Sequence, residues 1–115
     1  MITFSHLGSL GRLGNQLFQY AALKSVALDG GFSAKIPHPD NLVWHGQECQ
    51  LKHFNLECEY LTPQDLREIK YQFREPAPAK FFPEIFTVSS HTDLFGYFQN
   101  YKYFAKHEDQ IRKEF

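Results

Sequence analysis

The sequence predicts an α/β fold with a parallel sheet, and three observations support this prediction. An apolar start at residues 2–4 indicates a short buried strand, and a glycine series follows it directly. Residues 16–28 then contain neither Gly nor Pro, and a second short run at 32–36 is stopped by prolines. A strand, a loop, a helix and a strand in this order form a βαβ unit, which favours parallel pairing of the two strands.

The helix expected at 16–28 has good local support. Its alanines favour helix, Asn15 is a suitable N-cap, and Gly30 and Gly31 are expected to end it. One narrow arc of its surface carries mostly small side chains: Phe18, Ala21, Ala22 and Ser25. The helix can therefore approach the sheet closely.

Residues 41–60 show a weaker pattern, and no element is assigned to them. A second helix is expected to run from Pro63 to about Phe73. Thr62 can cap it, Pro63 suits its first position, and Asp65 places an acidic group in its first turn.

The last third is expected to hold one more strand and a helical end. Three prolines between 75 and 84 predict an extended connection, which Phe81, Phe82 and Phe86 hold down. A strand is expected over 92–98 and a helical stretch from Tyr101 onward, with Phe104, Ile111 and Phe115 on one face. Because the helical pattern continues to the last residue, we expect the chain to be a piece of a longer one.

The composition limits the function classes. The 115 residues are 43% hydrophobic, which allows one modest core and a single domain, 1–115. The 12 Lys and Arg nearly balance the 13 Asp and Glu, and the absence of a basic block argues against nucleic acid as a partner. No run approaches the roughly 20 apolar residues of a membrane span, and the start lacks an export signal. We expect an unexported, cytoplasmic chain.

Two cysteines, Cys49 and Cys58, give no disulfide framework in a chain without signs of secretion. His45, Cys49 and His53 follow one another at steps of four, which on a helix would align three possible zinc ligands. Gly46 weakens the helical pattern there, and ligand pairs in structural zinc sites are usually closer. Ordinary residues are the favoured interpretation, and no metal cofactor is expected.

The glycine series Gly8, Gly11 and Gly14 lies where a strand turns into a helix, a position at which free backbone N–H groups attract anions. Arg12 adds a positive charge, and Asn15 can donate hydrogen bonds. The spacing matches neither of the two common glycine-rich nucleotide motifs. On physical grounds alone, a phosphate site and a simple tight turn remain open alternatives.

Two segments resemble one family. Residues 11–21, GRLGNQLFQYA, closely resemble the opening signature of the α-1,2-fucosyltransferases (glycosyltransferase family 11), which usually carry Met at the position of Leu17. Residues 96–104, GYFQNYKYF, followed by 111–113, resemble the G-Y-F-Q-S-x-K-Y-F segment of the same family, with Asn100 in place of Ser. The middle of the chain contributes only a generic likeness.

The resemblance implies an inverting enzyme that transfers fucose from GDP-fucose to the 2-hydroxyl of a galactoside in glycan synthesis, without a metal. It implies two Rossmann-like halves facing a cleft (GT-B type), of which residues 1–115 would be the N-terminal half. The family's donor-binding segment, His-x-Arg-Arg-Gly-Asp, and the C-terminal domain that carries it are absent from this sequence. The isolated chain is therefore expected to be inactive, and the family likeness admits a peripheral association with a membrane.

The resemblance also suggests site residues. The candidates for the donor's diphosphate or fucose are Gly11, Arg12, Gly14, Asn15 and Gln16. Phe98, Gln99 and Tyr103 are candidates for the cleft, although aromatic residues at such positions more often belong to a core. No catalytic residue is identified, because Asp40, Glu48, Asp65 and Asp93 could each act as a general base.

Two other interpretations remain open. The chain could be a non-catalytic carbohydrate- or nucleotide-binding remnant of such an enzyme, which has kept the loop and lost the catalytic half. It could also be an unrelated phosphate-binding βαβ domain, in which case the likeness of residues 96–104 is a coincidence.

Overall fold

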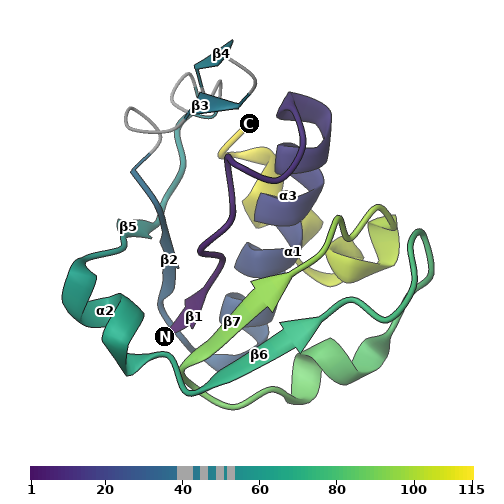
Figure 1. Cartoon of the computed structure of the whole chain (residues 1–115). Helices are drawn as coiled ribbons and strands as arrows, with labels where there is room; N and C mark the ends of the chain where they lie inside the picture. The colour runs from purple at the N-terminus through teal and green to yellow at the C-terminus, as the bar shows by residue number, and fades with distance from the viewer. Residues whose placement is uncertain (39–42, 45–46, 49–50, 52–53) are drawn as a thin grey trace.

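The computed structural model describes residues 1–38, 43–44, 47–48, 51 and 54–115. Its main feature is a five-stranded sheet in which every neighbouring pair is parallel, with the order β5-β2-β1-β7-β6 (Figure 1). The strands of this sheet are β1 (Ile2–Thr3), β2 (Ala34–Ile36), β5 (Glu59–Tyr60), β6 (Tyr71–Arg74) and β7 (Thr92–Phe95). A separate antiparallel pair consists of β3 (Val43–Trp44) and β4 (Gln47–Glu48).

The predicted βαβ unit is confirmed. β1 leads through the glycine loop into α1 (Leu13–Gly30), and β2 returns parallel to β1 with Ile2 opposite Ala34. Gly31 ends α1 in the left-handed conformation, with φ 70°, and its N–H donates to carbonyls of the last turn.

The start of α1 differs from the prediction. Asn15 is not the N-cap: the N-cap is Arg12, which makes no side-chain cap bond, and Asn15 lies in the first turn. The physical reason is the turn at Gly11, whose φ of 89° reverses the chain immediately before Arg12. The helix can therefore begin at Leu13.

The second helix, α2 (Pro63–Glu68), begins as predicted. The Thr62 N–H donates to Asp65 Oδ2 at 3.0 Å, and the Asp65 N–H donates to Thr62 Oγ1 at 3.1 Å, which makes a capping box. Its expected end at about Phe73 is wrong, because residues 71–74 form strand β6. Residues 71–74 are a strand because they pair with β7. The conformational preferences of the individual residues do not reveal this long-range pairing.

The region after β7 is a chain of short turns. The strand expected over 92–98 ends at Phe95, because Gly96 has φ 152° and Phe98 has φ 52°. The helical stretch expected from Tyr101 is present in pieces: η4 (Tyr101–Tyr103), η5 (Ala105–His107) and α3 (Glu108–Arg112). A further 3-10 turn, η3 (Pro83–Thr87), begins in the proline-rich connection. Phe81 and Phe86 pack against the core as expected, whereas Phe82 is not part of that cluster.

The two faces of the sheet differ in character. Ile2 and Ala34 belong to the apolar core, together with side chains of α1 such as Leu23. The next residues in register, Thr3, Lys35 and Asp93, lie in one row and face the opposite way. Figure 1 shows α1 and the C-terminal helical segment on the same side of the sheet, where α3 contacts α1.

The described part of the chain contains no helix that is long and apolar enough to cross a membrane.

Candidate functional site

The candidate site lies at the carboxyl ends of β1 and β7, which are neighbours in the sheet. The glycine loop leaves β1 there, and residues 96–100 leave β7 beside it (Figure 1). The strand order continues from β1 toward β2 and β5 on one side, and toward β7 and β6 on the other. In open α/β sheets, ligands bind outside the carboxyl ends of strands at such a reversal.

The glycine loop has a fixed turn at Gly11. With φ 89°, this residue occupies a conformation that side chains disfavour, and a Cβ built there would lie 2.7 Å from Asn15 Nδ2. Two further bonds shape the loop: Leu7 N–H to Phe4 O and Ser9 N–H to His6 O, both at 3.0 Å. The resulting turn delivers the chain directly to the N-terminus of α1.

The N-terminus of α1 presents free donors. The backbone N–H groups of Leu13, Gly14 and Asn15 have no acceptor among the described residues, and the first helical bond is Gln16 N–H to Arg12 O at 2.9 Å. Gly14 is exposed, and a Cβ at this position would have no heavy atom within 4 Å. Three open amides on an 18-residue helix, with exposed Arg12 next to them, suit an anionic ligand.

Two glutamines brace the loop from inside. Gln16 is 3% exposed, and its Nε2 donates to Gly11 O at 3.1 Å. Gln19 is fully buried, and its Nε2 donates to both Leu10 O at 2.9 Å and Gly96 O at 3.1 Å. The five loop candidates thus have two different roles. Arg12, Gly14 and Asn15 are accessible to solvent, whereas Gly11 and Gln16 are buried and stabilise the turn.

The three cleft candidates separate into two groups. Gln99 is exposed at the loop, and its Nε2 donates to Asn15 Oδ1. Phe98 and Tyr103 are fully buried and pack edge to face, with ring centroids 5.3 Å apart. The Tyr103 hydroxyl accepts from the Phe82 N–H at 3.0 Å and donates to Lys80 O at 2.9 Å, and burial raises its pKa. Only Gln99 reaches the loop, and the two aromatic rings belong to the core.

Among the four carboxylates considered as bases, Asp93 lies at the site. Asp65 is engaged in the capping box and in an ion pair with Lys35 at 3.0 Å. The Thr62 N–H, followed by Lys35, lowers the pKa of Asp65. Asp40 lies outside the described residues, and the structure does not describe the side chain of Glu48.

Asp93 is 5% exposed and accepts three hydrogen bonds across the boundary between β1 and β7. Its Oδ1 accepts from Thr3 Oγ1 at 2.6 Å and from the Ser5 N–H at 2.8 Å, and its Oδ2 accepts from Ser5 Oγ at 2.6 Å. The carboxylate therefore ties the first residues of the glycine loop to β7.

Ser5 and His6 also lie at the site, and the sequence had not predicted them as site residues. His6 is exposed, its Nδ1 lies 3.3 Å from Ser5 Oγ, and its ring meets the Phe95 ring edge to face at a centroid distance of 5.1 Å. Their place directly after the first strand of a βαβ unit was the signal that could have identified them.

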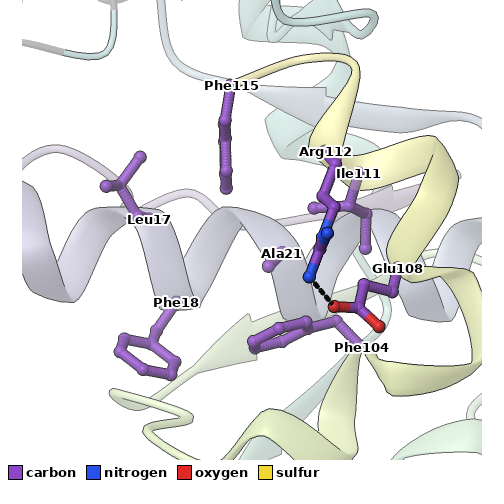
Figure 2. Close-up of a pocket in the computed structure, with 8 residues that line it drawn as sticks. All are labelled: Leu17, Phe18, Ala21, Phe104, Glu108, Ile111, Arg112 and Phe115. Carbon is purple, nitrogen blue, oxygen red and sulfur yellow. Dashed lines mark hydrogen bonds and ion pairs between the residues drawn. The ribbon is translucent and has the colours of Figure 1, made fainter.

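An apolar groove lies apart from this site, and none of the loop candidates lines it. The groove has a volume of about 320 Å³ and lies between α1 and the C-terminal segment. Figure 2 shows the side chains that line it. Its walls are Leu17, Phe18, Ala21, Phe104, Glu108, Ile111, Arg112 and Phe115, with a Glu108–Arg112 ion pair at 2.5 Å. The predicted apolar face of Phe104, Ile111 and Phe115 thus turns toward α1. Ile111 is 3% exposed and Phe115 is 43% exposed, so packing against α1 buries this face only in part.

Metal ligands do not gather in the described part of the chain, where no group of three or more His, Cys, Asp or Glu could hold an ion. The zinc alternative at His45, Cys49 and His53 lies outside the described residues. No family model, no curated protein and no solved structure matches the chain.

Proposed function

We propose that this chain forms the glycine-loop half of an inverting α-1,2-fucosyltransferase, a GT-B enzyme that moves fucose from GDP-fucose to the 2-hydroxyl of a galactoside. In this proposal the chain supplies one wall of the donor site. A second half, carrying arginines for the diphosphate, supplies the other.

The observation that carries the proposal is the open N-terminus of α1. Its free amides at Leu13, Gly14 and Asn15 lie at the carboxyl edge of a parallel sheet, beside exposed Arg12. A diphosphate is the part of GDP-fucose that such donors recognise best, because backbone N–H groups and the helix dipole both favour negative charge. The five-stranded parallel sheet is compatible with a Rossmann-like half.

The contact between the two family-like segments is a second support. Gln19 and Asn15 belong to the first segment, and Gly96 and Gln99 belong to the second. Gln19 Nε2 donates to Gly96 O, and Gln99 Nε2 donates to Asn15 Oδ1. Two segments that resemble one family and are far apart in the sequence therefore meet at one site, as parts of a common binding surface would.

The proposed transfer does not require the loop amides or Arg12 to form a covalent bond with the substrate. In an inverting transfer the acceptor oxygen attacks C1 of fucose while the bond from C1 to the phosphate oxygen breaks, and its electron pair leaves with GDP. Amide donors and a cation stabilise the charge that develops on the departing diphosphate. The loop amides and Arg12 suit this role.

A binding experiment tests the proposal on the chain itself. We expect GDP-fucose and GDP to shift the backbone ¹H–¹⁵N resonances of Leu13, Gly14 and Asn15, and guanosine to leave them unchanged because it lacks the diphosphate. Resonances in α2, such as that of Leu66, serve as an internal control. Shifts confined to residues outside the loop would contradict the assigned site.

Transfer distinguishes the enzyme from a binding remnant. A radiolabelled assay with a galactoside acceptor is applied to the longest natural chain that contains this sequence. Fucose on the 2-hydroxyl supports the transferase, whereas diphosphate-dependent binding without transfer supports the non-catalytic alternative.

A further inference from the structure

A hydrogen-bonded series runs from the buried carboxylate of Asp93 to the exposed ring of His6. Ser5 Oγ lies 2.6 Å from Asp93 Oδ2 and 3.3 Å from His6 Nδ1. The other oxygen of Asp93 is occupied by Thr3 Oγ1 and the Ser5 N–H. The three side chains therefore form a continuous series that leads from the sheet to the exposed surface at the candidate site.

The direction of these hydrogen bonds follows from the acceptor-only character of an ionised carboxylate. Ser5 must donate its only hydroxyl proton to Asp93, so the same oxygen can only accept from His6. Nδ1 of His6 then carries the proton, and Nε2 is left with a free lone pair. The order is Asp93, Ser5, His6, with the serine between the carboxylate and the imidazole.

Two further contacts fix the position of His6. Its carbonyl oxygen accepts from the Ser9 N–H at 3.0 Å and from Ser9 Oγ at 3.1 Å. Its ring stands at 86° to the ring of Phe95, the last residue of β7. An imidazole that is held at both backbone and ring, yet exposed, is suited to meet a ligand at this edge of the sheet.

We propose that His6 is the general base that accepts the proton of the acceptor hydroxyl, with Ser5 and Asp93 as positioning residues that keep Nε2 unprotonated. This inference rests on the proposed fucosyl transfer. The hydroxyl proton moves to His6 Nε2, the freed oxygen bonds to C1 of fucose, and the C1–phosphate bond breaks with its electron pair on GDP. The imidazolium that forms is stabilised through Ser5 by the carboxylate of Asp93.

The test reads the tautomer of His6 directly from its two ring nitrogens in ¹⁵N NMR spectra of the full chain, with His6→Gln identifying the resonances. We expect the Nδ1–H form in the parent. Ser5→Ala removes the hydroxyl that accepts from Nδ1, so the population should move toward the Nε2–H form. Thr87→Ala is the control, because it removes an exposed hydroxyl that donates to Glu84 O within η3 and takes no part in the Asp93–Ser5–His6 series. A predominant Nε2–H form in the parent, or a Ser5→Ala spectrum equal to that of the parent, would overturn the proposal.

A second measurement adds methyl β-galactoside to the chain in the presence of GDP-fucose. The Nε2 resonance of His6 is expected to shift. If GDP-fucose shifts the amides of residues 13–15 and the galactoside leaves Nε2 unchanged, the role of His6 is overturned and the donor site stands. If the loop amides do not respond to GDP-fucose, the proposed function fails, and the tautomer comparison still decides whether the relay exists.

Discussion

The Nε2 group of Gln19 donates to the carbonyl oxygen of Gly96 at 3.1 Å, joining the first helix to the exit of β7 across 77 positions of the chain. The same nitrogen donates to Leu10 O in the glycine loop at 2.9 Å. One buried amide thus fixes the distance between the two loops that border the candidate site.

Replacing Gln19 tests how much its side-chain amide contributes to the stability of the fold. Gln19→Met keeps the length of the side chain but leaves two inward carbonyls without their donor, which costs about 1–3 kcal/mol for each unsatisfied group. We expect a lower free energy of unfolding in urea. Gln64→Met, which changes an exposed amide of α2, is the control and should unfold like the parent. Equal midpoints for the two variants would show that Gln19 does not hold the loops.

Two glycines of the loop give opposite expectations. Gly11→Ala should destabilise the chain, because φ is 89° and the new methyl group would lie 2.7 Å from Asn15 Nδ2. Gly14→Ala should leave stability unchanged or raise it by up to about 1 kcal/mol, since the position is helical and its surroundings are open. Thermal melts decide between these expectations.

Gly14→Ala should nevertheless weaken the binding of GDP-fucose, because the methyl group occupies the space beside the free amides. The expected result is a stable variant with a several-fold smaller NMR response of residues 13–15 at equal ligand concentration. Asn15→Ala should behave alike, since Asn15 is not the helix cap. Unchanged binding in both variants would remove the loop from the donor site.

The buried phenol of Tyr20 should make the free energy of unfolding decrease at alkaline pH. Burial, and next the hydrogen bond that it donates to Glu114, raise the pKa of this phenol far above its usual value. The unfolded chain therefore loses the proton at about pH 10 while the folded chain keeps it, so stability falls as the pH rises beyond that point. Tyr20→Phe should flatten this part of the stability curve between pH 9 and 11. Tyr101→Phe, at a side chain that is 64% exposed, should leave the slope as it is in the parent.

The carboxylate of Asp65 should make the free energy of unfolding decrease at acidic pH. Its pKa is lowered first by the Thr62 N–H and then by Lys35, so its contribution is complete above the unfolded value of about 4 and is lost as the pH falls through the folded value. The difference in unfolding free energy between the parent and Asp65→Asn should shrink from pH 6 to pH 3. Asp109→Asn, at an exposed position of α3, is the comparison. A difference that does not change with pH would exclude an ionised Asp65 as its source.

The first part of the fold was predictable because its signals are local. A glycine-rich turn, a helix without breakers and a stop at Gly30 and Gly31 follow from the preferences of single residues. Strand β6 was not predictable in this way, because residues 71–74 continue a helical pattern and become a strand only through β7. The N-terminus of α1 was misplaced by three residues, since the conformation of Gly11, and not a capping side chain, determines where it begins.

The candidate site was predictable to a similar extent. The glycine loop is visible in the sequence, whereas the partnership of Ser5 with Asp93 spans 88 positions and depends on the register of β1 against β7. Asp93 was one of four carboxylates that composition alone could not distinguish. Its three hydrogen bonds single it out only once the two strands are neighbours.

The central place of β1 in the sheet also governs the order in which the chain can fold. Its partner on one side, β2, follows within 36 residues, but its partner on the other side is β7, which begins at Thr92. During synthesis, the first half of the chain therefore has β1 as an open edge, ready to pair with any other extended segment. The glycine loop acquires its brace to Gly96, and the candidate site its shape, only after the last strand has been made.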